Sequence, residues 1–212
     1  MNSDNFVQFY IKIDFRDELS SVLLLHWFCC TICHILKTQE KRLLNIELLT
    51  EKNFTPTSLD SFKRTQTVKK VYRRQNDKYA LVDMPYTEDW TLERKRKEAQ
   101  FLRSSECIAY LALENNTVAG FTSLKKQLYA SYMILDMMHV SADYRGKGIG
   151  RQLFNCAKEE AKKSGATSLY ISACSAEETI AFYKAMGAEI TENPIKEFAE
   201  AEPYDLQMIC KL

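Results

Sequence analysis

The feature that most constrains this chain is a glycine-rich turn placed directly between an apolar strand and a helix. Residues 131–140 (SYMILDMMHV) are apolar on both faces and predict a strand in the interior of a sheet. Residues 149–164 place apolar side chains at helical spacing, and residues 168–173 predict a second strand. Strand, turn, helix and strand form a crossover unit, which indicates an α/β protein with a mixed sheet. Three of the six glycines of the chain lie in the turn: Gly146, Gly148 and Gly150.

The rest of the chain adds further elements around this unit. A loop at residues 53–58 contains Pro, Ser and Thr, and favours a helix that starts at Leu59 with Thr57 or Ser58 as its cap. The remaining predicted strands are 43–49, 78–84, 107–113, 117–124 and 205–212, and the remaining predicted helices are 91–103 and 177–186.

Composition limits the function classes. The chain has 212 residues, of which 46% are hydrophobic and 27% are charged, as in an ordinary globular domain with an appendage. A net charge of +1 gives no general attraction for nucleic acid or an anionic membrane. A basic run over residues 37–74 and an acidic run over residues 189–205 are interpreted as solvated faces. The seven cysteines show no disulfide pattern, so a reducing cytoplasm is expected.

The N-terminal residues 1–42 are expected to form an extension, and residues 43–212 the main domain. The stretch 20–36 is apolar but too short for a membrane span, so it predicts a helix that packs on the domain or mediates a homodimer. Within it, Cys30-x-x-Cys33-His34 matches a haem attachment pattern, but the chain start lacks an export signal. A zinc site would need a second Cys or His pair. No metal is therefore expected.

The turn itself predicts an anion site, because the first amides of a helix have no intrahelical partner and lie at the positive end of its dipole. A Walker A loop is excluded, since Gly150 is followed by Arg151 instead of Lys. A dinucleotide-binding turn is also excluded, because the glycine spacing differs and the next strand ends without an acidic residue.

The turn Arg145-Gly-Lys-Gly-Ile-Gly150 resembles the Arg/Gln-x-x-Gly-x-Gly/Ala signature of the GNAT superfamily of N-acyltransferases. A second landmark of that family, a Phe-Tyr pair followed four residues later by Gly, resembles Phe182-Tyr183 and Gly187. The resemblance covers about residues 43–212 and is most specific over 133–187. It implies a mixed, mostly antiparallel sheet flanked by helices, and acetyl-CoA as the acetyl donor.

The same resemblance assigns the donor site. The turn would hold the pyrophosphate, and the backbone at Met138 and Val140 would pair with the pantetheine arm while the Met138 N–H polarises the thioester carbonyl. Many members carry Asn where this chain has Ala176, so the contact made by that Asn is either lost or supplied by Ser175. The expected donor-binding residues are Met138, Val140, Arg145, Gly146, Lys147, Gly148, Ile149, Gly150 and Ser175.

Two residues are candidates for proton transfer. Asp136 is the single acid in its apolar strand and is the candidate base, acting directly or through water, with a structural role as the alternative. Tyr183 is the candidate acid for the leaving thiolate, with simple packing as the alternative. Alternation places His139 on the opposite face from Asp136, which makes it a core residue. Cys174 has no evident His partner, so direct transfer is expected.

These residues predict an N-acetyltransferase that acts on a primary amine of a small molecule or peptide. The acceptor would contact residues 59–90 and 189–204, where the acidic run and the aromatics Tyr86, Trp90 and Tyr204 suit a cationic amine. The alternative is a regulatory module that binds acyl-CoA without turnover. A working acid and base distinguish the two.

Overall fold

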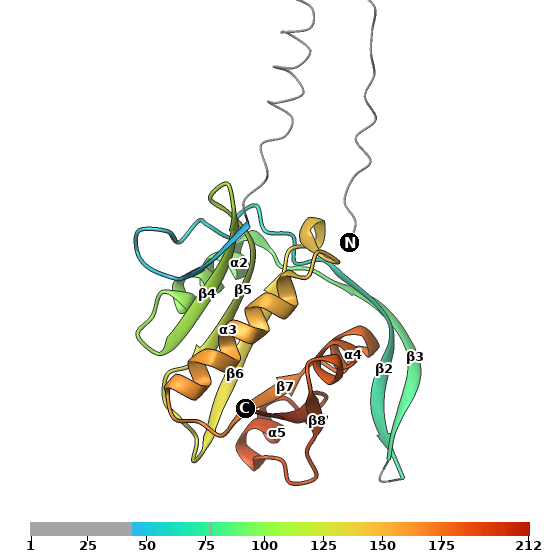
Figure 1. The fold of residues 1–212 in the computed structure, drawn as a ribbon. Helices are drawn as coiled ribbons and strands as arrows, with labels where there is room; N and C mark the ends of the chain where they lie inside the picture. Colours follow the sequence, from blue (N-terminus) through green and yellow to red (C-terminus); the bar gives the residue numbers. More distant parts are fainter. Residues whose placement is uncertain (1–43, 77) are drawn as a thin grey trace, which may run out of the picture. The chain divides into compact units, whose positions relative to one another are not determined.

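The computed structural model describes residues 44–76 and 78–212 (Figure 1). The predicted N-terminal extension 1–42, with its apolar stretch and cysteine cluster, lies outside the described residues. A seven-stranded sheet runs through the described part, with the strand order β1-β4-β5-β6-β7-β9-β8. In this order the strands are β1 (Leu44–Leu48), β4 (Cys107–Glu114), β5 (Thr117–Lys125), β6 (Tyr132–Val140), β7 (Ser168–Ala173), β9 (Leu206–Lys211) and β8 (Ala188–Ile190).

Neighbouring strands of this sheet are antiparallel except β6 and β7, which are parallel. The β6–β7 pairing ends at Leu135 and Ile171, although β6 continues to Val140. The C-terminal part of β6 therefore leaves the edge that faces β7 unpaired within the described sheet. A mixed, mostly antiparallel sheet was the predicted fold class, and it is confirmed.

Helices cover both faces of the sheet. Helix α3 (Ile149–Lys163) packs on one face through the predicted stripe Leu153, Phe154, Ala157 and Ala161, which is fully buried. Helix α2 (Leu92–Leu102) packs on the other face, and the Thr91 hydroxyl caps it by accepting from the Arg94 N–H over 3.2 Å. The remaining helices are α4 (Glu177–Ala185), α5 (Lys196–Ala201) and the short 3₁₀ helix η1 (Ala142–Tyr144).

A β-bulge interrupts β6. Met137 pairs with Ser123 of β5, whereas the next pair in register joins Leu135 to Leu124, so Asp136 is an extra residue with no partner in β5. One extra residue reverses the alternation of side chains along the rest of the strand. Asp136 and His139 therefore lie on the same face, the one covered by α2, and the prediction that they face opposite ways is wrong.

A second difference lies at residues 56–61, which form turns instead of the predicted helix from Leu59. Leu59 and Phe62 are buried beneath this loop against the α2 face of the sheet. The chain then forms a separate two-stranded hairpin of β2 (Gln66–Gln75) and β3 (Lys78–Glu88), seen beside α4 in Figure 1. The hairpin is joined to the loop after β7 by the Tyr72 N–H, which donates to the Ser175 carbonyl over 2.8 Å.

Candidate active site

The glycine turn has the backbone that the sequence predicts for an anion site. Gly146 and Gly148 have φ values of 75° and 78°, in the left-handed region that glycine adopts without a steric penalty. Gly148 is the N-cap of α3, so the first amides of that helix open onto the turn. A Cβ at either glycine would meet no atom within 4 Å, which leaves open space beside the backbone.

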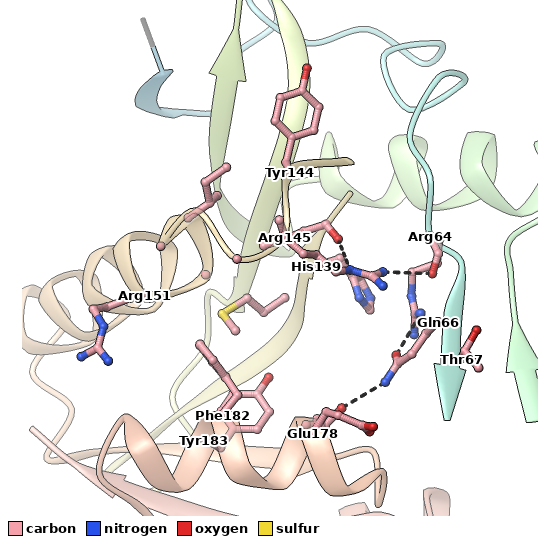
Figure 2. Close-up of a pocket in the computed structure, with 17 residues that line it drawn as sticks. Arg64, Gln66, Thr67, His139, Tyr144, Arg145, Arg151, Glu178, Phe182 and Tyr183 are labelled. Atoms are coloured by element: carbon pink, nitrogen blue, oxygen red, sulfur yellow. Dashed lines mark hydrogen bonds between the residues drawn. The ribbon is translucent and has the colours of Figure 1, made fainter. Parts of the chain in front are cut away.

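A cavity of about 560 Å³ begins at this turn and extends to α4. Figure 2 shows its side chains, which come from β2, β6, the turn, α3 and α4. Most of the predicted donor-binding residues line it: Met138, Val140, Arg145, Gly146, Gly148, Ile149 and Gly150. A phosphate-bearing ligand with a long arm fits such a cavity, because the turn offers amides at one end and the cavity continues past β6 toward α4.

Two predicted donor-binding residues do not line this cavity. The Lys147 ammonium lies over the Tyr144 ring, 4.8 Å from its centroid. Ser175 is buried, and its hydroxyl accepts a hydrogen bond from Arg73 Nη1 over 2.6 Å. Both side chains are thus engaged with other parts of the protein.

The Arg145 side chain supports the turn from behind. Its Nε donates to the Val140 carbonyl over 3.0 Å, and its Nη2 reaches the Arg64 carbonyl over 3.5 Å (Figure 2). Burial and the nearby Arg64 lower the pKa of Arg145. The loop before β2 is also joined to the residue before η1, since the Lys63 N–H donates to Ser141 Oγ over 3.1 Å. Arg145 therefore positions this loop against the glycine turn.

Sequence reasoning missed the part of the cavity wall that comes from Arg64, from β2 and from the first turn of α4. Arg64 is only 6% exposed, and its Nη2 lies 3.2 Å from Glu88 Oε2. Gln66 accepts from Arg64 Nη1 over 3.2 Å and donates to Thr179 Oγ1 over 3.4 Å. The basic run predicted a solvated face, but Arg64 points inward, and no local pattern distinguishes it from its exposed neighbours.

His139 lines the cavity as a neutral side chain. Its ring packs edge-on against Trp90 at 4.9 Å and against Phe121 at 5.5 Å between centroids. Burial and the positive charges of Arg64, Arg145 and Arg94 lower the pKa of His139 to about 3. This environment agrees with the packing role predicted for His139. The predicted face of the strand was wrong, because the bulge puts His139 on the same face as Asp136.

Tyr183, the predicted acid, lies in the cavity wall opposite β6. Figure 2 shows its hydroxyl directed into the cavity from α4. The residue is 7% exposed, and burial, then the charges of Asp205 and Cys174, raise the pKa of its phenol. Tyr183 therefore holds its proton at neutral pH, as a general acid must.

Asp136, the predicted base, lies in a different cavity. That space of about 740 Å³ is bordered by the end of α2, the turn after β5 and α5, and it includes Lys125 and Phe198. Burial raises the pKa of Asp136, while Lys125 opposes that shift. The structure therefore does not bring Asp136 and Tyr183 into one cavity.

Over residues 44–76 and 78–212, no helix combines the length and apolar character needed to cross a membrane. In the same part of the chain, no group of His, Cys, Asp and Glu side chains is arranged to hold a metal ion.

Comparison with solved structures identifies the fold. Nourseothricin acetyltransferase superposes with a TM-score of 0.62 at 16% identity, covering 79% of this chain and 98% of that chain. A putative streptothricin acetyltransferase from Bacillus anthracis, solved with acetyl coenzyme A, gives 0.62 at 19% identity, with coverage of 80% and 99%. The ribosomal-protein-S18-alanine N-acetyltransferase from Escherichia coli gives 0.51 at 16% identity, with coverage of 80% and 94%.

Comparison with sequences identifies the family. No curated protein sequence matches the chain. The family model described as "Acetyltransferase (GNAT) family" matches residues 75–188, which include the glycine turn and Tyr183. Membership confirms the predicted enzyme class, and acetyl-CoA is the acetyl donor of that family. By this match, which spans more than half of its length, the chain belongs to the GNAT family of acetyltransferases.

Proposed function

We propose that this acetyltransferase moves the acetyl group of acetyl-CoA directly to a primary amine of a small molecule or a peptide. The observation that carries the proposal is the single cavity that joins the glycine turn to the Tyr183 hydroxyl. A phosphate site at one end and a proton donor at the other are what a thioester-dependent transfer needs.

The donor supplies an acetyl group activated as a thioester. The amides at the start of α3 would bind its pyrophosphate, with Gly146 and Gly148 leaving room for close approach. The free edge of β6 at Met138 and Val140 would pair with the extended arm, and Arg151 at the cavity wall adds positive charge for a phosphate.

Proton transfer falls to residues on either side of β6. An amine with a pKa of about 10 is protonated at neutral pH and must lose a proton before attack. Tyr183 would give its phenolic proton to the leaving sulfur. Asp136, through water, is one candidate for the base that activates the amine.

Two of the aromatic side chains predicted to contact the acceptor, Trp90 and Tyr204, pack against arginines of the chain. Arg64 and Arg94 lie 5.6 and 5.8 Å from the Trp90 ring centroid, and Arg73 lies 5.2 Å from that of Tyr204, so both rings already contact cations of the chain. Support for a cationic acceptor therefore comes from the carboxylates of Glu88, Glu202 and Asp205, which lie close enough to one another to interact electrostatically. Structures similar to this chain include an enzyme named for nourseothricin and one named for a ribosomal-protein alanine. The proposal therefore includes both a small-molecule amine and a peptide amine as acceptor.

A cytoplasmic location and a homodimer through residues 20–36 belong to the same proposal. The four cysteines of the described residues are free thiols, as expected in a reducing compartment. The dimer rests on the apolar sequence alone.

The alternative is a module that binds acyl-CoA without turnover. Thiol release from acetyl-CoA, measured with a panel of polyamines, aminoglycoside-like amines and peptides, tests the proposal. We expect release that depends on one amine class and that falls about 100-fold in Tyr183→Phe. CoA binding without thiol release from any amine would favour the module.

A further inference from the structure

We propose that Asp205 accepts the proton released by the acceptor ammonium and that its neutralisation assists proton donation by Tyr183. The inference rests on the proposed function, and it assigns to Asp205 a role that the family signature does not cover. Asp205 lies immediately before β9, about 20 residues beyond Tyr183 in the sequence.

The sheet register places Asp205 opposite Cys174 at the end of β7, just outside the residues that line the cavity. The last pair between β7 and β9 joins Ala173 to Leu206, so the next residues outward are Cys174 and Asp205. Cys174 in turn lies 3.9 Å from the Tyr86 hydroxyl of the hairpin, measured from its Sγ. The end of β7, the start of β9 and the hairpin therefore meet around Cys174, and Tyr183 of α4 packs in the same core cluster as Ala173 and Leu206.

Asp205 is half-buried in a negatively charged environment. Burial and the carboxylates of Glu202 and Glu88 raise the pKa of Asp205 to about 6, while Arg73 opposes the shift. Arg73 also donates to Ser175 Oγ and to the Tyr72 carbonyl, and it packs on Tyr204. The titratable and charged groups around the cluster are Arg73 from β2, Tyr86 and Glu88 from β3, Cys174 after β7, Tyr183 from α4 and Glu202 after α5.

Asp205 and Tyr183 influence each other electrostatically. The negative charge of Asp205 is one cause of the raised pKa of Tyr183. When Asp205 takes up a proton this cause disappears, and Tyr183 becomes a stronger acid. For Asp136, by contrast, the neighbouring charges that shift its pKa are Lys125 and Glu98, not Tyr183.

Asp205 takes a proton from the acceptor ammonium, and the free amine forms the new N–C bond while the C–S bond breaks. Tyr183 gives its phenolic proton to the departing sulfur, and protonated Asp205 returns a proton to the tyrosinate. The second proton of the amine nitrogen leaves to solvent, so both side chains regain their starting states.

The experiment measures kcat/KM against pH for the full chain, with the amine from the panel that gives thiol release. In the wild type, kcat/KM should fall as the pH drops below about 6, because protonated Asp205 cannot accept a further proton. Asp205→Asn should remove this acidic limb and lower kcat about 100-fold or more. Asp205→Glu should retain the acidic limb and have a kcat between those of the wild type and Asp205→Asn.

Three further measurements separate a proton-transfer role from a structural one. Glu202→Gln should move the acidic limb to lower pH, because it removes a charge that raises the Asp205 pKa. Asp83→Asn, an exposed change on the hairpin, should leave profile and rate as in the wild type. Carboxyl NMR titration should give Asp205 a midpoint near pH 6 without any acceptor.

Some outcomes would overturn the inference. Loss of the acidic limb in Asp136→Asn and its retention in Asp205→Asn would assign the base to Asp136. An NMR midpoint near pH 4 for Asp205 would show that its pKa is not raised, and it would contradict the inference even if the variants lowered turnover. Absence of thiol release with every amine would instead refute the proposed function, and the Asp205 role with it.

Discussion

The guanidinium of Arg73 donates to the hydroxyl of Ser175 over 2.6 Å, and this bond fastens the β2–β3 hairpin to the loop that follows β7. Sequence resemblance assigns Ser175 to the donor site, but in this structure its hydroxyl accepts a hydrogen bond from Arg73 of the hairpin. The wall of the cavity on the β2 side therefore depends on a bond that lies outside the family signature.

Replacing Ser175 by Ala should lower the free energy of unfolding by about 1.5 kcal/mol, because a hydrogen bond to a charged group is lost from a buried position. CoA affinity should remain as in the wild type. Chemical denaturation and titration calorimetry measure the two quantities. A tenfold loss of CoA affinity with unchanged stability would restore Ser175 to the donor site.

Gly148→Val should abolish CoA binding, since the added side chain would occupy the space beside the amides of α3. Gly165→Val is a matched control at the other end of the helix, because both glycines have similar positive φ values, 78° and 81°. Both variants carry a backbone strain of about 1–2 kcal/mol. Equal CoA affinity in the two variants would show that the turn does not contact the donor.

Tyr183→Phe should lower kcat about 100-fold while the Kd for acetyl-CoA changes little, because the hydroxyl acts when the thiolate leaves. Tyr170→Phe is a suitable control, since its hydroxyl accepts a hydrogen bond from the Ile195 N–H at 2.9 Å, outside the cavity. Steady-state kinetics with equilibrium binding tests both. A change in turnover of only a few fold in Tyr183→Phe would leave water as the acid.

His139 should stay neutral in the native protein from pH 8 down to about pH 4, since its pKa is lowered from 6.5 to about 3. The unfolded chain binds this proton below pH 6.5 and the folded chain does not. Stability should therefore fall as the pH decreases from about 6.5 toward 3. Imidazole NMR and pH-dependent unfolding check this, and His139→Gln should show a shallower decline. An imidazole midpoint near 6.5 would contradict the prediction.

A chain of residues 43–212 should fold and bind CoA as the full chain does, because the strands, the turn and Tyr183 all lie within it. Its oligomeric state should be lower if residues 20–36 mediate a dimer. Calorimetry and light scattering on both chains provide the comparison. Failure of the shorter chain to fold would place the N-terminal residues in the core and move the domain boundary.

Elements with a strong local pattern were predictable from the sequence. Helix α3 follows from its apolar stripe, which includes Leu153 and Ala157, and the hairpin of β4 and β5 follows from two apolar runs around the turn at Asn115. The glycine turn was also predictable from a local pattern, because an anion site of this kind is built from consecutive backbone amides.

The remaining features depend on contacts between distant segments. Leu59 has helix-like flanking signals, but tertiary packing buries it beneath a turn. Strand β2 was missed because its buried valines, Val68 and Val71, are three residues apart, and the register shift between Val68 and Lys70 that puts both inside breaks the period of two. Arg64 reaches the cavity only through the loop before β2, and Asp205 lies opposite Cys174 only through the register of β9, and no local pattern reveals either position.

The bulge at Asp136 makes the length of β6 as important as its side chains. Deleting one residue between Leu135 and Val140 would remove the bulge and restore regular pairing with β5. Deleting Asp136 itself would leave Met137 opposite Ser123 and every following side chain on its present face, whereas deleting Met138 would place Met137 opposite Thr122 and turn it to the other face. A scan of single-codon deletions should therefore find Asp136 the most tolerant position of this short segment and the positions after it less tolerant.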